Sequence, residues 1–461
     1  MANSNSKPTG VDRISNLPDS LLCHILSFLT TKEAVVTSIL SNRWKTLWTL
    51  VPKLDFDSHQ FEETSSSDEE QSPNQFNRYG FTFAHIVSRV WALRNRNRNN
   101  ANPLKQFRLY WHSDSDPIQV ETWVHAALSH ELEELELRIC FPELFNFPSA
   151  LFNYAKTLVV LNLMGNNVFV NPPSSALLGF PSLKTLHLEN VWYAKPDSFS
   201  RFLSLCPVLQ NLSLNLQTYT YDVLKIVVPT LKRLHLDFNN SAYQYSKFEI
   251  NAPPLEYLCF RGYVIEDALL GNLSNLVEAN IEVDYDEIKD YGNMIMDFIK
   301  QLSNVKFLHL DSVLTQFLCK ATKFDLPMFH NLAFLNFHVN ACLWHVLPHL
   351  LHLAPNLAVL VFEKEYTGFY ACDEEDTSII ERMFNEDVPI CISSHLKTFH
   401  FIGFQGLMYE LKFVGHILKT ARFLKTMTVS SANIDSEEQF LALKELLMLP
   451  RESRTCQIAF D

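Results

Sequence analysis

Apolar and polar positions alternate in a repeating pattern along most of the chain from residue 104 onward. Each repeat places leucine, or another apolar residue, at its first, fourth and sixth positions, as in residues 158–163 and 231–236. The pattern begins at Leu104, Leu132, Leu158, Leu183, Leu209, Leu231, Leu255, Leu276, Val305, Leu332, Leu357, Leu396 and Leu424. Most starts are 21 to 29 residues apart. A fixed period of this length predicts stacked units that bury their apolar sides against one another.

This period and pattern are typical of leucine-rich repeats. The apolar residues of each short strand point inward and those between them point outward. We therefore expect an α/β fold in which residues 79–385 form a leucine-rich-repeat solenoid. Its curved parallel sheet lies on the concave side, and helices or irregular segments lie on the convex side.

The spacing fails once, between Leu357 and Leu396. The excess includes residues 363–377, with an acidic run at residues 373–376. Carboxylates are costly to bury, so we expect an exposed loop there. A plain solvated loop and a recognition loop both fit this composition.

A short segment before the repeats, residues 11–57, predicts three helices. Pro18 suits the first turn of the first helix, and Thr30 with Glu33 has capping-box spacing for the second. Residues 43–50 form the third. The first helix carries a broad apolar face, made of Leu21, Leu22, Ile25, Leu26 and Leu29. So small a segment cannot cover all its apolar side chains, which indicates a protein-binding surface.

The segment that follows is polar and acidic. We expect residues 58–78 to be a flexible acidic linker and residues 81–93 to form an amphipathic helix. The basic run at residues 94–100 fits a solvated loop better than a nuclear localisation patch, because its arginines are not contiguous.

The N-terminal segment resembles the F-box. The resemblance is carried by Ile14, by Leu17-Pro18-Asp19, by the apolar face of the first helix and by residues 41–48. It implies docking to a Skp-type adaptor, which links the chain to a cullin–RING ubiquitin ligase. The adaptor-binding residues would be Ile14, Leu17, Pro18, Leu21, Leu22, Ile25, Leu29 and Trp44. The alternative is an ordinary three-helix part of a larger core.

The C-terminal segment, residues 386–461, resembles the FBD domain. The resemblance rests on a cysteine–serine opening at residues 391–394, a Leu-Lys strand at residue 396, a Phe-x-Gly turn at Gly403, a helix from Glu410 and a Leu-Lys-x-Met strand at residue 424. The chain as a whole thus resembles plant F-box/FBD/leucine-rich-repeat proteins. We expect the FBD segment to close the open end of the sheet.

Candidate chemistry is sparse. No phosphate-binding, metalloprotease or serine-hydrolase motif occurs, and glycine is scarce, at 11 residues. His345, His349 and His352 have helical spacing, but apolar neighbours and Pro348 favour packing over metal binding. We therefore expect no catalytic residue, no metal and no cofactor.

The net charge and the cysteine content limit the possible binding partners and the cellular compartment. The net charge of −13 argues against nucleic-acid binding. Nine scattered cysteines without a C-x-x-C pair indicate buried thiols in a reducing compartment. No signal peptide or membrane-spanning segment is evident, so we expect the nucleus or the cytoplasm, and no membrane partner.

The outward residues of the strands are the best candidates for contacting a target. They mix acidic, basic, histidine and aromatic side chains, and acidic residues outnumber arginines, which suits a protein ligand of mixed or somewhat basic character. The candidates are Arg138, His187, Arg233, His235, Tyr257, Arg261, Phe307 and His309. Simple solvation of the sheet fits any one of them equally well.

The sequence thus predicts a non-catalytic, substrate-recognition subunit of a Skp–cullin–F-box ubiquitin ligase, which would bind the adaptor through the F-box and an unknown protein target through the repeats. A leucine-rich-repeat interaction scaffold without a role in degradation is the alternative.

Overall fold

The structure is a computed structural model. It describes residues 14–460 apart from residues 15, 62–72, 97–103, 113–114, 148, 171, 173–178, 194–195, 218–222, 239–246, 263–266, 272, 285–291, 322–323, 341–345, 366–387 and 432–435. The chain divides into two compact units. The first holds residues 1–193 and 205–207, and the second holds residues 194–204 and 208–461.

The first unit begins with the predicted helices. They are α1 (Asp19–Leu26), α2 (Thr31–Val36) with the short helix η1 (Thr37–Ile39), and α3 (Trp44–Leu47) with η2 (Trp48–Leu50). The predicted capping box is confirmed, since the Thr30 side chain accepts from the Glu33 backbone N–H and the Thr30 backbone N–H donates to the Glu33 carboxylate. Pro18 lies one residue earlier than expected, at the N-cap of α1.

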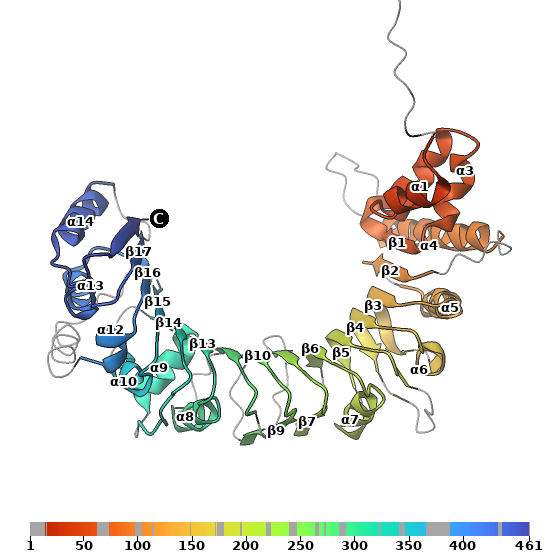
Figure 1. Ribbon diagram of the computed structural model, residues 1–461. Helices are drawn as coiled ribbons and strands as arrows, with labels where there is room; N and C mark the ends of the chain where they lie inside the picture. Colours follow the sequence, from red (N-terminus) through yellow and green to blue (C-terminus); the bar gives the residue numbers. More distant parts are fainter. Residues whose placement is uncertain are drawn as a thin grey trace, which may run out of the picture. The chain divides into compact units, whose positions relative to one another are not determined.

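The sheet of the first unit is parallel throughout. Its strands follow the chain in the order β1 (Lys53–Asp57), β2 (Gln106–Trp111), β3 (Glu134–Asn146), β4 (Val160–Phe169) and β5 (Thr185–Trp192). Helices α5 (Pro117–Leu128) and α6 (Ser149–Tyr154) lie along one side of these strands (Figure 1). Strand β1 belongs to the segment assigned to the F-box, which therefore supplies the first strand of the sheet.

The segment between the helices and the repeats differs from expectation. Residues Ser58–Phe61 form the short helix η3, and helix α4 spans Pro73–Arg96. It therefore begins inside the predicted flexible linker and extends into the predicted basic loop. Arg94 is buried rather than solvated, and its Nη1 donates to the Val51 carbonyl oxygen at 2.7 Å. Burial lowers the Arg94 pKa to about 10.

The second unit carries a parallel sheet of the same kind. Its strands are β6 (Asn211–Gln217), β8 (Arg233–Asp237), β10 (Tyr257–Gly262), β12 (Glu278–Val283), β13 (Phe307–Leu310), β14 (Phe334–Val339), β15 (Val359–Lys364), β16 (Thr398–Phe404), β17 (Thr426–Ser431) and β18 (Gln457–Phe460). Its helices are α7 (Pro196–Ser204), α8 (Gly292–Lys300), α9 (Ser312–Lys320), α10 (Leu347–Leu353), α12 (Ile390–Ser394), α13 (Met408–Thr420) and α14 (Ser436–Met448).

A second, three-stranded sheet was not predicted. It consists of β7 (Val223–Val227), β9 (Lys247–Asn251) and β11 (Asp267–Leu270), in the order β11-β9-β7 and parallel. Figure 1 shows β7 and β9 on the opposite side of the unit from β6 and β10. The connecting segments of these repeats are therefore strands rather than helices.

The leucine pattern defines the core as predicted. All thirteen residues that begin the repeats are exposed by 3% or less. Strand after strand alternates between buried and partly exposed positions, as in β2, β12 and β14. The inward and outward assignments made from the sequence are thus confirmed for these strands.

The FBD segment extends the sheet of the second unit. Strands β16, β17 and β18 pair in parallel beyond β15. The predicted helix from Glu410 is α13, which begins two residues earlier, at Met408. Leu411, Val414 and Leu418 in the helix and Ala421 at its C-cap are buried as expected. In the described part of the chain the sheet ends at β18, a strand of four residues. The segment thus moves the open edge onto a very short strand, which limits pairing with other chains.

The segment predicted to be an exposed loop begins later than expected. Glu363 and Lys364 belong to strand β15, and Lys364 is 4% exposed. The remainder of the predicted loop from residue 366 lies outside the described residues.

Candidate protein-binding surfaces

Helix α1 has two apolar faces, of which one is buried and the other is exposed to solvent. Leu22 and Leu26 are 0% and 1% exposed and form the core of the helical module. Leu21, Ile25 and Phe28 are 48%, 45% and 76% exposed. Leu21 and Ile25 are four residues apart and share a face of α1 that the module itself does not cover, and Phe28 lies in the turn that follows the helix.

Further exposed apolar side chains lie in the segments before and after α1. Val36, Ile39 and Leu40 are 56%, 82% and 64% exposed, and Ile14 before α1 is 57% exposed. Phe28, Val36, Ile39 and Leu40 were not among the predicted adaptor-binding residues. We call the set of Ile14, Leu21, Ile25, Phe28, Val36, Ile39 and Leu40 the exposed apolar set. Uncovered apolar side chains in such number are typical of a protein-binding surface.

The other predicted adaptor-binding residues fall into two groups. Pro18 is exposed and Leu17 and Leu29 are partly exposed, so they are accessible to a partner. Leu22 and Trp44 are buried inside the module. Any contribution of these two to adaptor binding would act through the shape of the module.

Arg43 holds the segment before α1 in place. Its Nη2 donates to the Leu17 carbonyl oxygen at 2.6 Å, and its guanidinium pairs with the Asp19 carboxylate at 2.5 Å. The pair is partly exposed, so its main effect is to fix the direction of the chain rather than to add much stability.

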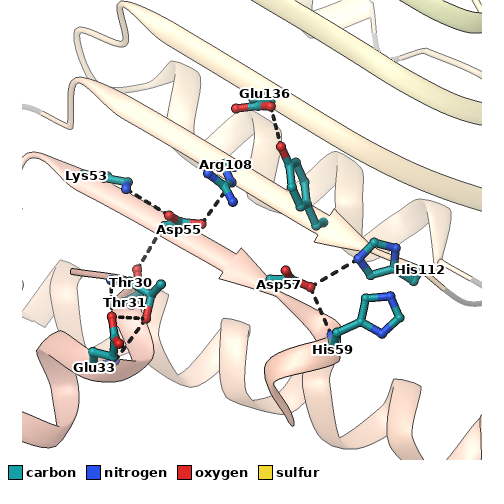
Figure 2. Close-up of polar contacts among 11 residues, drawn as sticks. Thr30, Thr31, Glu33, Lys53, Asp55, Asp57, His59, Arg108, His112 and Glu136 are labelled. Carbon is teal, nitrogen blue, oxygen red and sulfur yellow. Dashed lines mark hydrogen bonds and ion pairs between the residues drawn. The ribbon is translucent and has the colours of Figure 1, made fainter. Parts of the chain in front are cut away.

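Polar contacts fasten the helical module to the sheet (Figure 2). The backbone N–H of Asp55 on β1 donates to Thr31 Oγ1 on α2 at 2.7 Å. The Asp55 side chain is 4% exposed and forms ion pairs with Lys53 at 2.9 Å and Arg108 at 3.2 Å. The Thr31 contact thus joins α2 to β1, and the buried ion pair of Asp55 with Arg108 joins β1 to β2.

A pair of histidines lies beside this network. The rings of His59 and His112 have centroids 3.7 Å apart, and His112 Nε2 lies 3.2 Å from Asp57 Oδ1 (Figure 2). Burial and the neighbouring His59 lower the pKa of His112. Among the described residues, no group of three or more histidine, cysteine or carboxylate side chains could hold a metal ion.

The outward face of the first unit is built around Tyr110. Its hydroxyl donates to Glu136 Oε1 at 2.5 Å, while the guanidinium carbons of Arg108 and Arg138 lie 4.4 and 5.2 Å from its ring centroid. The predicted target residue Arg138 is exposed. His187, on β5, lies 3.4 Å from the carboxylate of Glu189.

The outward face of the second unit holds the six remaining target candidates. Arg233 stacks on Tyr257 with 4.9 Å between guanidinium carbon and ring centroid. Arg261 forms an ion pair with Glu282, with 2.5 Å between the charged atoms. His235 is partly exposed, and Phe307 is 40% exposed with His309 two residues further along β13. Adjacent strands therefore place all six on one face of this sheet.

The remaining chemical candidates are the histidines near α10 and the cysteines. Leu350 and Leu351 of α10 are buried, whereas His349 and His352 are exposed on the same helix, and His345 lies outside the described residues. The seven cysteines in the described ranges are all free thiols. Burial raises the pKa of Cys206, Cys319 and Cys391 to about 12, which disfavours the nucleophilic thiolate form. No helix in the described ranges is long and apolar enough to span a bilayer.

The modular order matches three known families. The F-box domain matches residues 14–56, the leucine-rich repeats of the FBD-associated F-box protein At5g56370 match residues 120–279, and the FBD domain matches residues 385–429. Their order agrees with the helical module, the repeat strands and the C-terminal segment described above.

Similar proteins cover nearly the whole chain. The FBD-associated F-box protein At3g52670 of Arabidopsis thaliana is 31% identical, over 98% of this chain and 98% of the relative. The F-box/FBD/LRR-repeat protein At3g52680 of Arabidopsis thaliana is 34% identical, over 98% of this chain and 93% of the relative. The fold is that of a multidomain protein in which a helical module is followed by repeat strands and the FBD segment. By these matches, the chain belongs to the F-box/FBD/LRR-repeat protein family.

Proposed function

We propose that this chain is the substrate-recognition subunit of a Skp–cullin–F-box ubiquitin ligase. The exposed apolar set on the F-box module would bind a Skp-type adaptor, and the outward faces of the strands would bind a protein target. The single observation that carries the proposal is this exposed set on a module fastened by Thr31 and Asp55 to the repeat strands.

The energetics favour the F-box module as the anchor. Burying one large apolar side chain contributes about 1.5–3 kcal/mol, so a few members of the exposed apolar set would be enough to hold a partner. The fastening to β1 and β2 would then transmit the position of the adaptor to the repeats of the first unit. Ubiquitin transfer itself would be carried out by the associated enzymes, in the nucleus or the cytoplasm.

Co-purification with a Skp-type adaptor and a cullin tests the proposal. We expect the wild type to retain both, and Leu17→Ala/Pro18→Ala and Ile25→Ala/Phe28→Ala to lose them. The matched control is Ile118→Ala, which removes an apolar side chain that is 75% exposed on α5, away from the F-box helices. If the wild type retains no adaptor, the proposal is wrong.

A scaffold without a role in degradation is the second candidate. A scaffold would use the same exposed apolar set and the same strand faces as a ligase subunit. The two functions therefore differ only in which partner proteins are bound. Adaptor retained without cullin would favour the scaffold. Cullin retained together with the adaptor, and ubiquitination of a bound protein, would favour the ligase.

A further inference from the structure

The strands of the second unit are in register, so their outward side chains form rows across the sheet. One row runs Arg233, Tyr257, Glu278, Phe307 and Phe334, each paired with the next through neighbouring strands. Neighbouring strands lie about 4.8 Å apart. This spacing brings aromatic rings and a single carboxylate into contact range along the row.

The rings on β13 and β14 form a continuous platform. The centroids of Phe307 and Phe334 are 6.0 Å apart, and His309 lies 5.1 Å from Phe334. Phe307 is 40% exposed and Phe334 is partly exposed, although both are large apolar side chains. Part of each side chain is therefore accessible to a ligand.

Glu278 lies beside this platform, and its carboxylate charge is only weakly neutralised by its ion-pair partner. Its ion-pair partner is His309, with 3.9 Å between Nε2 and Oε1, and the Glu278 side chain is 40% exposed. Burial lowers the pKa of His309, so its ring is mostly neutral near pH 7. The carboxylate thus faces solvent next to two aromatic rings, which is the combination that attracts a cation.

The same row already contains an example of such a contact. In the row, Tyr257 and Phe307 lie on opposite sides of Glu278. The guanidinium carbon of Arg233 lies 4.9 Å from the ring centroid of Tyr257. A guanidinium supplied by a ligand could adopt the equivalent position over Phe307 while donating to the Glu278 carboxylate. Arginine suits this geometry because its planar group stacks on rings and binds carboxylates with two parallel hydrogen bonds.

We propose that Glu278, Phe307 and Phe334 form a binding site for an arginine side chain of a protein target. The site deepens the proposed function, on which it rests, by naming the chemistry of the target segment. The net charge of −13 favours the approach of such a basic segment.

Two labelled peptides test the site directly on the full chain. One has the sequence Gly-Ser-Phe-Arg-Phe-Arg-Gly-Ser, and its partner carries uncharged citrulline in place of both arginines. Fluorescence anisotropy would measure their affinities. We expect the arginine peptide to bind about fivefold or more tightly than the citrulline peptide.

Matched variants locate the effect. Glu278→Gln and Phe307→Ser should each remove most of the preference for arginine. Glu256→Gln is the control, because this carboxylate is 52% exposed, lies one residue before β10 and pairs with Lys232. It should leave the preference unchanged. Equal affinity for both peptides, binding of neither, or an unaltered preference in Glu278→Gln would overturn the site.

Adaptor co-purification of the same proteins separates this inference from the proposed function. Retained adaptor without a preference for arginine rejects the site alone. A preference for arginine without retained adaptor supports the site and rejects the ligase role.

Discussion

Lys364 and Glu410 form a buried ion pair that joins a repeat strand to the FBD segment. The distance from Lys364 Nζ to Glu410 Oε1 is 2.7 Å, and the two side chains are 1% and 0% exposed. Gln405 Oε1 and the Tyr409 hydroxyl also contact Lys364 Nζ. The other Glu410 oxygen accepts from the backbone N–H groups of Gln405 and Leu407. The Lys364 charge is thus satisfied by the FBD segment, and the Glu410 charge by Lys364 together with backbone N–H groups of its own segment.

Removing one partner of this pair should be costly. We expect Lys364→Met to destabilise the FBD segment by about 3–5 kcal/mol, because it leaves the Glu410 carboxylate buried without its cation. Lys364→Met/Glu410→Gln should recover part of this loss. Hydrogen exchange of the α13 and β16 amides, together with urea unfolding, measures both effects.

The exposed pair of Lys232 and Glu256 gives the matched control. Their side chains are 50% and 52% exposed, with 3.6 Å between the charged atoms. We expect Lys232→Met to cost less than about 1 kcal/mol. Equal effects of the two lysine substitutions would contradict the structural role assigned to Lys364.

Gly403 should tolerate no side chain. Its φ is +82°, and a Cβ there would overlap the Lys364 carbonyl oxygen on β15. Gly403 lies at the irregularity in the pairing of β16 with β17. Gly403→Ala is expected to destabilise by more than about 1 kcal/mol. Gly415→Ala on α13 is the control, because its nearest contact would be a flexible Leu449 side chain at 3.5 Å. It should stabilise by about 0.5–1 kcal/mol. Thermal unfolding of both variants would show shifts of the same sign if this explanation were wrong.

The repeat strands could be predicted because their period is simple. Every inward leucine of the pattern is buried, and outward residues such as Tyr257 and Phe307 lie where alternation placed them. The rows across the sheet depend on the register between neighbouring strands, and the residue pattern of one strand does not specify that register. Glu278 was therefore not among the predicted site residues.

Three features escaped sequence reasoning for physical reasons. Strands β7, β9 and β11 are four or five residues long and lack the leucine pattern, so only their pairing reveals them. Arg94 is charged, but its buried side chain donates a hydrogen bond to the Val51 carbonyl oxygen, a contact that the sequence pattern does not reveal. Apolar spacing in α1 identified the residues without telling the covered face from the uncovered one.

That distinction within α1 leads to a direct test at two neighbouring residues. Leu22→Ala should destabilise the helical module by about 2–5 kcal/mol, because Leu22 is 0% exposed and its loss leaves a cavity. Leu21→Ala should cost less than about 1 kcal/mol, because Leu21 is 48% exposed. Hydrogen exchange of the α1 and α3 amides measures both. If Leu21→Ala were the more destabilising change, the assignment of the two faces would be reversed.

Asp311 should make stability depend on pH with a known sign. It is the N-cap of α9, where Oδ1 accepts from the Leu314 N–H at 2.9 Å and Oδ2 accepts from the Val283 N–H at 3.1 Å. Burial outweighs these bonds and raises its pKa from 3.8 to about 6. The folded state therefore holds this proton more strongly than the unfolded state does.

The stability that this proton contributes is fully present below about pH 3.8 and is lost as the pH rises through about 6. We expect the unfolding free energy of the wild type to fall relative to Asp311→Asn across this window. Asp311→Ser keeps a capping side chain without a charge and should behave like Asp311→Asn. Other groups titrate in all three proteins, so they cancel in the differences. Urea unfolding at a series of pH values from 4 to 7 measures these differences, and parallel profiles for the three proteins would show that Asp311 does not titrate in this range.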